Sequence, residues 1–409
     1  MNILFKIAWR NVWRNPRRSW VLISAIALGV FTFLGALGYM GALTGSMINS
    51  AIELQGGHLQ LASKGYFENP DPYNRMDDMA SLESLLNEVP ELAYSPTVTF
   101  AGMVTSSEQA SGVMIHGIDP PSYEAILPLS ERMTEGTTLD EEAKGAEILI
   151  SSTLADQLNV LPGEKIVLMA NDVENELAQA AFRVSGLFKT SSGEFDKTNL
   201  FISLPQARDM IGYADEEISV MALRLVRNAE LDPVQASLSS KINTENVELL
   251  SWKERNPFMV MMLDVQDFGI YILIGLLFTA IVFTIINSFL MVIFERIHEF
   301  GILMANGTRP FQIRVMLYVE ALFIALIGIA VGSIFAFLLL NYWIQNGLDL
   351  SAFSDSLSAM GVDTVIYPSL DWGQVRSGFI MIFAMVLLSV LYPAFKASRF
   401  EPVDAINYV

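Results

Sequence analysis

The sequence predicts an α-helical membrane protein with four transmembrane helices and one large α+β domain outside the membrane. Hydrophobic residues make up 52% of the 409 residues and charged residues 17%, whereas soluble proteins usually carry about a quarter charged residues. Four apolar stretches reach the roughly 20 residues that a helix needs to cross a bilayer. Residues 49–267, between the first two stretches, are numerous enough for one or two soluble domains.

The four apolar stretches are residues 20–48, 268–294, 315–343 and 376–395. The third contains one charged residue, Glu320, and the fourth is uncharged from Ser377 onward. Each must be helical, because a helix satisfies its own backbone groups in lipid. The first is longer than a bilayer requires, so we expect its surplus to project outward as a stalk, with residues 256–267 as the returning stalk. A cleaved signal peptide would have a much shorter apolar core.

The distribution of Lys and Arg predicts the orientation of the spans. Basic residues mark three segments, 1–19, 295–314 and the tail 396–409. Residues 46–267 contain 14 basic and 35 acidic side chains, and the loop 344–375 contains four acids and no base. Because Lys and Arg in short loops mark the cytoplasmic side, we expect both termini and the 295–314 loop inside, and the large domain and the 344–375 loop outside.

The outer domain has mixed secondary-structure patterns, which is typical of an α+β fold. A polar insert at 170–181, between two predicted strands, indicates a projecting hairpin tip or a solvated loop. Asp77 and Asp78 are expected to cap the helix at 80–89. The patterns predict strands at 57–61, 96–104, 111–117, 147–150, 165–169, 182–188, 199–204 and 219–226, and helices at 80–89, 153–158, 205–211 and 233–242.

Several kinds of chemistry have no support in the sequence. Cysteine is absent, which excludes a thiolate zinc site, an Fe–S cluster and a thiol nucleophile. No P-loop for ATP and no Gly-x-Ser-x-Gly motif occurs. The histidines at 58, 116 and 298 have no metal-ligand spacing. A net charge of −19 argues against nucleic acid as a partner. We therefore expect no catalytic residue, metal or cofactor in this chain.

The N-terminal segment 3–13 predicts a basic amphipathic helix that lies at the inner lipid headgroups. The alternative is a simple positively charged anchor. Pro16 should end this helix, and Ser19 can cap the first span. The residues expected at the membrane interface are Lys6, Trp9, Arg10, Trp13, Arg14, Arg17 and Arg18.

The 295–314 loop contains a predicted short helix over residues 296–305, with Gly307 just past its end. Phe300, Leu303 and Met304 share one face of this helix. An apolar face in a cytoplasmic loop needs a partner, so we expect the helix to dock into a groove on a soluble protein. Replacing Phe300 and Gly301 by Asp should then abolish that association without preventing membrane insertion.

Two features inside the spans bear on helix packing. Glu320 lies near the inner interface, where an intramembrane acid is functional by default, although an interaction with Arg314 is an equally good explanation. Glycines at small-xxx-small spacing let helices approach closely. Such pairs occur at Gly41 and Gly45 and at Gly328 and Gly332.

The run ERIHEFGILMANGT at 295–308 resembles the coupling-helix signature of the FtsX/MacB/Lol superfamily of ABC transporter permeases. Segments 8–19, 148–169, 320–332 and 392–405 resemble four other motifs of the same superfamily, in the family's order. Met304 and Asn306 stand where a basic residue and Leu are common. The resemblance implies a MacB/FtsX-like permease fold and contact with a cytoplasmic ATPase through Arg296, Glu299, Phe300, Gly301, Leu303, Met304, Ala305 and Gly307.

The resemblance also implies a non-catalytic subunit in a bacterial inner membrane, with its domain in the periplasm. A separate ATPase dimer would bind ATP and Mg, and the second permease would be an identical copy or a paralogue. The size is most similar to lipoprotein-releasing permeases, which implies extraction of a lipoprotein or lipid-like substrate by mechanotransmission. Alternatives are an FtsX-like transducer that controls a periplasmic hydrolase and MacB-like efflux of a peptide or drug. A membrane-anchored enzyme has no residue constellation in its favour.

Two further sets of residues are expected to act on the cargo. In the lipoprotein-releasing permeases that this chain resembles, a hairpin hook recruits a periplasmic carrier, and the resemblance implies Asn171, Asp172, Glu174 and Glu176 as the candidates here. Flexible thioethers adapt to irregular apolar guests. The candidates for holding acyl chains at the outer ends of the first two spans are Met40, Met47, Met259, Met262 and Phe268.

Overall fold

The computed structural model describes the chain except for residues 1, 78, 140–144, 227–229, 243–245 and 400–409. Asp78, an expected helix cap, and the motif residues Pro402, Val403 and Ala405 therefore lie outside the described residues. The chain forms two units. Residues 1–45, 262–349 and 365–409 make a helical unit, and residues 46–261 and 350–364 make a unit built on a sheet.

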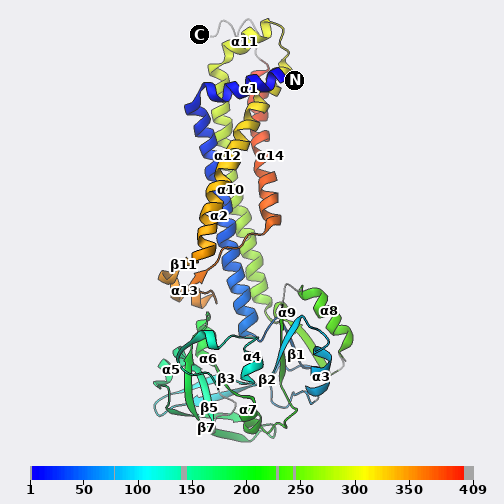
Figure 1. Ribbon diagram of the computed structural model, residues 1–409, viewed down its shortest axis with the longest axis vertical. Helices are drawn as coiled ribbons and strands as arrows, with labels where there is room; N and C mark the ends of the chain where they lie inside the picture. Colours follow the sequence, from blue (N-terminus) through cyan, green and yellow to red (C-terminus); the bar gives the residue numbers. More distant parts are fainter. Residues whose placement is uncertain (1, 78, 140–144, 227–229, 243–245, 400–409) are drawn as a thin grey trace. The chain divides into compact units, whose positions relative to one another are not determined.

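Four long helices lie side by side in the helical unit (Figure 1). They are α2 (Pro16–Leu54), α10 (Pro257–Glu295), α12 (Pro310–Asn346) and α14 (Trp372–Ala397), and all four are long and apolar enough to cross a membrane. This confirms the predicted fold class. The last nine residues of α2 belong to the sheet unit. The side chains of Phe278, Phe289 and Phe300 are fully buried in the core of the bundle.

The ends of these helices follow from local sequence. Pro16 and Pro310 are the first residues of α2 and α12, where a missing N–H costs nothing. Asp371 caps α14 by accepting a hydrogen bond from the Gly373 N–H at 2.7 Å. The expected cap at Ser19 is wrong. Because α2 already begins at Pro16, Ser19 is buried one turn inside the helix, and its hydroxyl donates to the Val12 carbonyl.

Glycines let α12 approach α2 closely. A Cβ at Gly332 would overlap the Ala27 carbonyl oxygen and lie 2.8 Å from the Val30 Cβ, and a Cβ at Gly328 would lie 2.8 Å from the Ile26 Cβ. These contacts confirm the packing predicted for this pair. The pair in α2 behaves differently, since a Cβ at Gly41 would meet Ser369 whereas one at Gly45 would meet nothing within 4 Å.

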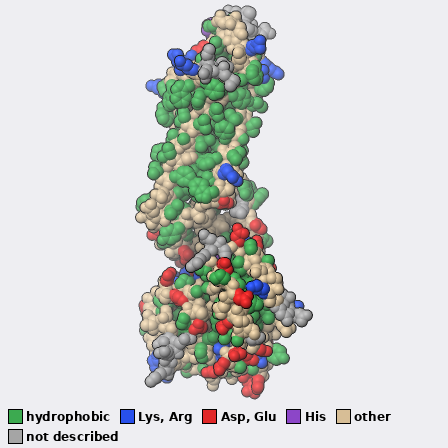
Figure 2. Space-filling model, turned by 45° about the vertical axis from the view of Figure 1, so that its right-hand side comes forward, with side chains coloured by type: hydrophobic (Ala, Val, Ile, Leu, Met, Phe, Trp, Pro, Cys, Tyr) green, Lys and Arg blue, Asp and Glu red, His purple; other side chains and the backbone are tan. Residues whose placement is uncertain are grey.

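Two shorter helices accompany the bundle, α1 (Asn2–Arg14) and α11 (Ile297–Ala305). Buried Ala8 and Val12 place α1 in the bundle core, and Trp9 packs edge-on against Phe323 of α12 with ring centroids 5.1 Å apart. On the face that Figure 2 shows, hydrophobic side chains cover the helical unit between its two ends, most of its Lys and Arg lie at one end, and Asp and Glu are spread over the sheet unit.

The sheet unit contains a ten-stranded sheet in the order β10-β1-β9-β2-β3-β8-β5-β7-β4, with β6 paired to β2 and β7. The β3–β8 and β5–β7 pairs are parallel and the other pairs are antiparallel. The strands are β1 (Leu59–Ser63), β2 (Leu92–Thr105), β3 (Ala110–Ile118), β4 (Met133–Gly136), β5 (Glu147–Ser151), β6 (Lys165–Asn171), β7 (Leu177–Phe188), β8 (Asn199–Ser203), β9 (Val220–Leu225) and β10 (Val247–Ser251).

Helices cover this sheet and close two apolar clusters. One cluster lies among β2, β3, β5 to β8, α5 and α7, and the other among β1, β9, β10, α3 and α8. A short loop element, α13 (Ser354–Ala359), follows the two-residue strand β11 (Leu348–Asp349), which pairs with β12 (Val365–Ile366). The sheet unit's helices are α3 (Met79–Leu86), α4 (Pro120–Tyr123), α5 (Ser152–Leu158), α6 (Gly193–Thr198), α7 (Leu204–Ile211), α8 (Leu231–Lys241) and α9 (Trp252–Arg255).

The polar insert at 170–181 forms the end of the β6–β7 hairpin, which confirms the predicted hairpin, but most of the insert is strand. The β6–β7 ladder continues to the pair Asn171–Leu177, which leaves only residues 172–176 as the tip. The Asp172 carboxylate accepts hydrogen bonds from the Glu174 and Glu176 N–H groups, both at 2.9 Å. The Val173 N–H donates to the Ile211 carbonyl at 3.1 Å, so the tip is held against the end of α7. The insert is therefore shorter and more firmly attached than expected.

Candidate functional site

The helix α11 ends in a well-defined cap. The Thr308 N–H donates to the Leu303 carbonyl and the Gly307 N–H to the Met304 carbonyl, both at 3.0 Å. This is the Schellman arrangement, which needs a left-handed residue just past the helix. Gly307 supplies it with φ +89°. The predicted helix and its end at Gly307 are confirmed.

The apolar face of α11, which we expected from the sequence to bind a soluble partner, packs instead against the helix bundle. Phe300 has no exposed surface, and Leu303 and Met304 pack against the core of the helical unit. The expected exposed apolar face is therefore wrong, because the bundle itself covers it. Replacing Phe300 by Asp would place a charge in that core and would not isolate an ATPase contact.

The opposite face of α11 carries the exposed residues. Ile302 is 43% exposed, and Ala305 and Asn306 are exposed three and four positions further along. Residues at this spacing share one helix face. Of the residues predicted to couple to an ATPase, Ala305 and Gly307 are exposed here. Ile302 was not among those residues, because sequence periodicity alone did not identify which apolar face is covered.

Arg296 connects α11 to the membrane-spanning helix α12. Its Nε lies 3.0 Å from Glu299 Oε2 and its Nη1 lies 3.4 Å from Glu320 Oε2. The side chains of Arg296 and Glu320 are 9% and 7% exposed. The suggested pairing of Glu320 with Arg314 is wrong, since the Arg314 guanidinium stacks on the Phe395 ring at 4.8 Å instead. A buried carboxylate thus has a buried guanidinium as its partner.

The same carboxylate that binds Arg296 also binds α1. Arg14 Nη2 lies 2.6 and 2.8 Å from the two carboxylate oxygens of Glu299, and Arg18 forms a salt bridge with Glu295. Arg14 and Arg18 were expected at the lipid headgroups, but both pair with carboxylates. We call Arg14, Glu299, Arg296 and Glu320 the ion-pair network. It joins α1, α11 and α12.

Glu299 makes this network sensitive to acid. Burial alone would raise its pKa, but hydrogen bonds from Arg14 and Arg296 outweigh burial and hold the pKa below its ordinary value. A carboxylate with a lowered folded-state pKa contributes stability that is present above its unfolded pKa, about 4.3, and is lost as the pH falls through the folded value. The attachment of α1 to α11 should therefore be complete at neutral pH and weaken only below about pH 4.

Spin labels can measure this attachment, because the chain has no native cysteine. In an R10C/A305C variant we expect one narrow distance distribution at pH 7 that broadens as the pH falls below about 4. Adding E299Q should broaden it already at pH 7 and remove the acid transition. An unchanged acid transition in the E299Q background would contradict the role of Glu299.

The other predicted interface residues remain exposed. Lys6, Arg10 and Arg17 are exposed. Trp9 and Trp13 pack edge-on with ring centroids 5.9 Å apart, and Trp13 packs on Trp20 at 6.2 Å. An exposed row of indoles beside cations suits a lipid headgroup region. These features agree with an interfacial helix.

The structure does not gather the five acyl-chain candidates in one place. Met47 and Met259 line one cavity of about 450 Å³ in the sheet unit. Met40, Met262 and Phe268 belong to the helical unit, where Gln266 Nε2 lies 3.7 Å from the Met40 sulfur and Phe268 is 66% exposed. The helical unit has its own apolar groove of about 240 Å³, which is lined mainly by Phe33, Leu37, Ile270, Tyr271, Ile274 and Met381.

The four candidates for carrier recruitment lie at or beside the tip of the β6–β7 hairpin. The Asn171 side chain donates to the Asn175 side chain at 3.1 Å, and Glu174 and Glu176 are exposed. Within the described residues no group of three His, Cys, Asp or Glu side chains is arranged to hold a metal ion. The tip therefore offers exposed carboxylates on a short, internally hydrogen-bonded turn.

Two family descriptions match the chain. Residues 19–241 match the MacB-like periplasmic core domain, and residues 271–402 match the FtsX-like permease C-terminal family. Among solved structures, the periplasmic region of MacB from Actinobacillus actinomycetemcomitans is 11% identical with a TM-score of 0.35, and covers 49% of this chain and 91% of its own. The extracellular domain of the transporter YknZ from Gram-positive bacteria is 12% identical with a TM-score of 0.32, covering 48% of this chain and all of its own.

Curated relatives extend over the full length. The lipoprotein-releasing system transmembrane protein LolC of Neisseria meningitidis is 23% identical over 95% of this chain and 93% of its own length. LolE of Haemophilus influenzae is 23% identical over the whole of both chains. The macrolide export ATP-binding/permease protein MacB of Escherichia coli is 23% identical over 64% of this chain and 41% of its own. Since the core-domain match alone spans more than half of the sequence, the chain belongs to the FtsX/MacB-type superfamily of ABC transporter permeases.

Proposed function

We propose that this permease subunit uses ATP-driven mechanotransmission to release a lipoprotein or lipid-like substrate from the inner membrane toward the outer membrane. The observation that carries this proposal is the similarity to LolC and LolE, which extends over at least 93% of both chains in two relatives. The MacB relative matches a smaller part, 64% of this chain. Full-length similarity favours the lipoprotein-releasing branch over the export branch.

The ion-pair network gives the proposed mechanism its input. A cytoplasmic ATPase dimer, which binds ATP and Mg, pushes on the exposed face of α11. Arg296 passes that motion to α12 through Glu320, and Glu299 passes it to α1 through Arg14. Charge-assisted pairs of this kind hold their geometry better than apolar contacts, since their hydrogen bonds are directional. The three elements then move as one body.

The helix α2 gives the proposed mechanism its output. It runs without interruption from Pro16 to Leu54. Near its end, Glu53 forms salt bridges with Arg132 and, at 3.2 Å, with Arg224. These three side chains are at most 29% exposed, so solvent screens them less than it would a surface pair. A helix fastened in this way can carry displacement into the sheet unit as rigid-body motion.

The remaining parts of the proposal concern partners and placement. Both termini and α11 lie in the cytoplasm, and the sheet unit lies in the periplasm. A second permease, either an identical copy or a paralogue, completes the complex, and membrane lipids surround the bundle. Acyl chains enter the apolar groove beside Phe33 and Ile270. The 172–176 tip is the candidate contact for a periplasmic lipoprotein carrier.

An Ile302 variant tests the proposal in one assay. Vesicles that contain this chain, its ATPase and its permease partner should release a labelled lipoprotein when ATP is added. Ile302→Asp places a charge on the exposed face of α11 and should reduce both ATPase association and release by tenfold or more, since truncating or charging a central contact costs at least about 2 kcal/mol. Ile302→Val keeps the apolar contact and should preserve both.

The possible outcomes separate the candidate functions. Release that fails in the wild type while the ATPase binds and turns over would overturn the lipoprotein proposal. Export of a peptide or drug under the same conditions would support the MacB-like alternative. Capture of a periplasmic hydrolase without lipid-dependent ATPase stimulation would support an FtsX-like transducer. Normal ATPase binding by the Ile302→Asp variant would contradict the assigned docking face.

A further inference from the structure

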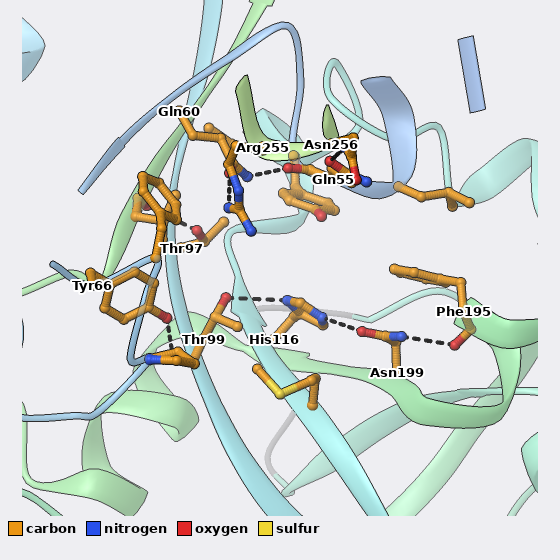
Figure 3. Close-up of a pocket in the computed structure, with 18 residues that line it drawn as sticks. Gln55, Gln60, Tyr66, Thr97, Thr99, His116, Phe195, Asn199, Arg255 and Asn256 are labelled. Atoms are coloured by element: carbon orange, nitrogen blue, oxygen red, sulfur yellow. Dashed lines mark hydrogen bonds between the residues drawn. The ribbon is translucent and has the colours of Figure 1, made fainter. Parts of the chain in front are cut away.

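The sheet unit contains a second cavity, of about 320 Å³, that no part of the proposed mechanism uses (Figure 3). Ligand pockets usually measure about 300–1,000 Å³ and combine apolar walls with a few convergent polar groups. Its walls come from β1, β2, β3, β8 and β9, from α4, α6 and residues 66–70, and from residues 54–56 at the end of α2 and 255–256 directly before α10. Figure 3 shows side chains from these elements pointing toward a common space.

Arg255 is the one Lys or Arg among the residues lining this cavity in the described part of the chain. Its guanidinium donates to the Gln60 side-chain oxygen and lies 4.1 Å from the centre of the Phe67 ring. No Asp or Glu among the described residues forms a salt bridge with Arg255, and none lines the cavity. In a domain with 35 acidic and 14 basic side chains over residues 46–267, an arginine held by an amide and a ring is available to an external anion.

The wall formed by β2, β3 and β8 is polar but neutral. Asn199 Nδ2 donates to the Phe195 carbonyl at 2.9 Å, which leaves its Oδ1 to accept from His116 Nε2 at 2.8 Å. The second ring nitrogen then accepts from the Thr99 hydroxyl at 3.2 Å. Burial lowers the pKa of His116, so the ring stays uncharged at neutral pH. The donors of Asn199, His116 and Thr99 are thus occupied by one another and by the backbone, and this wall adds no positive charge to that of Arg255.

Apart from Thr97 and the amides of Gln55, Gln60 and Asn256, the rest of the lining is apolar. Phe195 stacks on His116 with ring centroids 6.3 Å apart, and Tyr66 is fixed by a 2.7 Å hydrogen bond from its hydroxyl to the Thr99 carbonyl. Met114, Tyr123 and Val220 complete this part of the wall. The cavity therefore pairs one cation at one side with a preformed apolar surface.

We propose that this cavity binds a small amphiphilic anion, with a carboxylate or phosphate against Arg255 and an apolar tail against Phe195, Met114 and Tyr123. Asn256 Nδ2 donates to the Gln55 side-chain oxygen and to the Trp252 carbonyl, which orients the Gln55 amide beside the same space, where its Nε2 can donate to the anion. Arg binds planar oxyanions through two parallel N–H groups. Both carboxylate and phosphate satisfy this chemistry.

Binding at this site would act where α2 ends and α10 begins, within the sheet unit. Gln55 directly follows α2, and Arg255 and Asn256 directly precede α10. A ligand that contacts all three would add a bridge to the one that Gln55 and Asn256 already form. This inference does not depend on which cargo the permease moves.

Calorimetric titration of the full chain in lipid nanodiscs tests the site, with empty nanodiscs subtracted. The probes are octyl phosphate and octanoate, with octanol as the neutral analogue and ethyl phosphate as the tail-less one. We expect saturable binding of at least one octyl anion. Octanol and ethyl phosphate should each bind at least about tenfold more weakly than that anion, since a charge-assisted hydrogen bond and a buried tail each contribute a factor of this order. The two anions distinguish a carboxylate ligand from a phosphate ligand.

Two variants locate the binding. Arg255→Gln should lower the affinity for the octyl anion by about tenfold or more. Lys253→Gln changes the charge equally on the same helix, is exposed and does not line the cavity, so it should leave affinity unchanged. Equal affinity for Arg255→Gln and wild type, equal affinity for octanol and octyl phosphate, or no saturable binding would each overturn the proposal. A circular dichroism spectrum and melting point for Arg255→Gln like those of the wild type show that a loss is not unfolding.

Discussion

Replacing Arg296 by methionine is expected to destabilise the helical unit by about 3–5 kcal/mol, because it removes the partner of a buried carboxylate. Glu320 is 7% exposed and forms no second salt bridge among the described residues. Glu299 is less affected, since Arg14 still binds it at 2.6 Å. The midpoint of SDS-induced unfolding in mixed micelles should fall accordingly.

The two ends of this pair should not be equivalent. Glu320→Gln leaves Arg296 with Glu299 at 3.0 Å and keeps an oxygen that can accept a hydrogen bond, so it should cost clearly less than Arg296→Met. The double variant R296M/E320L replaces the pair by apolar groups and should recover much of the lost stability. Arg309→Met removes an exposed cation from the same loop and serves as the control. Similar midpoints for Arg296→Met and Arg309→Met would show that the pair does not hold α11 to α12.

The second large effect is expected at Gly332. Replacing it by alanine adds one Cβ that would overlap the Ala27 carbonyl oxygen and approach the Ala27 Cα at 2.9 Å. Backbone atoms of a packed helix cannot move aside as a flexible side chain can, so α2 and α12 must separate. Overpacking of this kind costs about 1–3 kcal/mol.

A second glycine provides the matched comparison. Gly275 lies in α10, is exposed, and would have nothing within 4 Å of an added Cβ. Gly275→Ala should leave the unfolding midpoint unchanged or raise it, because alanine favours helix over glycine by about 1 kcal/mol. If Gly332→Ala behaves like Gly275→Ala, the close approach of α2 and α12 is not what stabilises the bundle.

The membrane part of the fold could be predicted well because its signal is local. Uninterrupted apolar runs such as 20–48 are incompatible with water along their whole length, so no tertiary contact is needed to identify them. The end of α11 could also be predicted from a local signal, since glycine is the residue that most readily adopts a positive φ just past a helix, and Gly307 does so. The short strands β4 and β10 were missed because they lack the run of three apolar residues that marks the equally short β5 and β8.

The errors share a different cause, which is dependence on partners far away in the chain. Glu320 pairs with Arg296, 24 positions earlier, and neither residue's neighbours indicate this. Phe300 is apolar whether a soluble protein or the bundle covers it, so sequence alone cannot say which face of α11 is free. Arg14 and Arg18 carry the charge expected of headgroup contacts, yet Glu299 and Glu295 compete for them.

The double salt bridge at Glu53 has a consequence for the kind of motion that α2 can transmit. Arg132 and Arg224 come from different parts of the sheet unit and hold the two oxygens of one carboxylate. A helix with its side chains is about 10–12 Å across, so a roll of about 30° about its own axis would move the Glu53 carboxylate by about 3 Å, away from both guanidinium groups. The connection therefore resists torsion as well as sliding, and a twist applied to α2 should arrive at the sheet as torque.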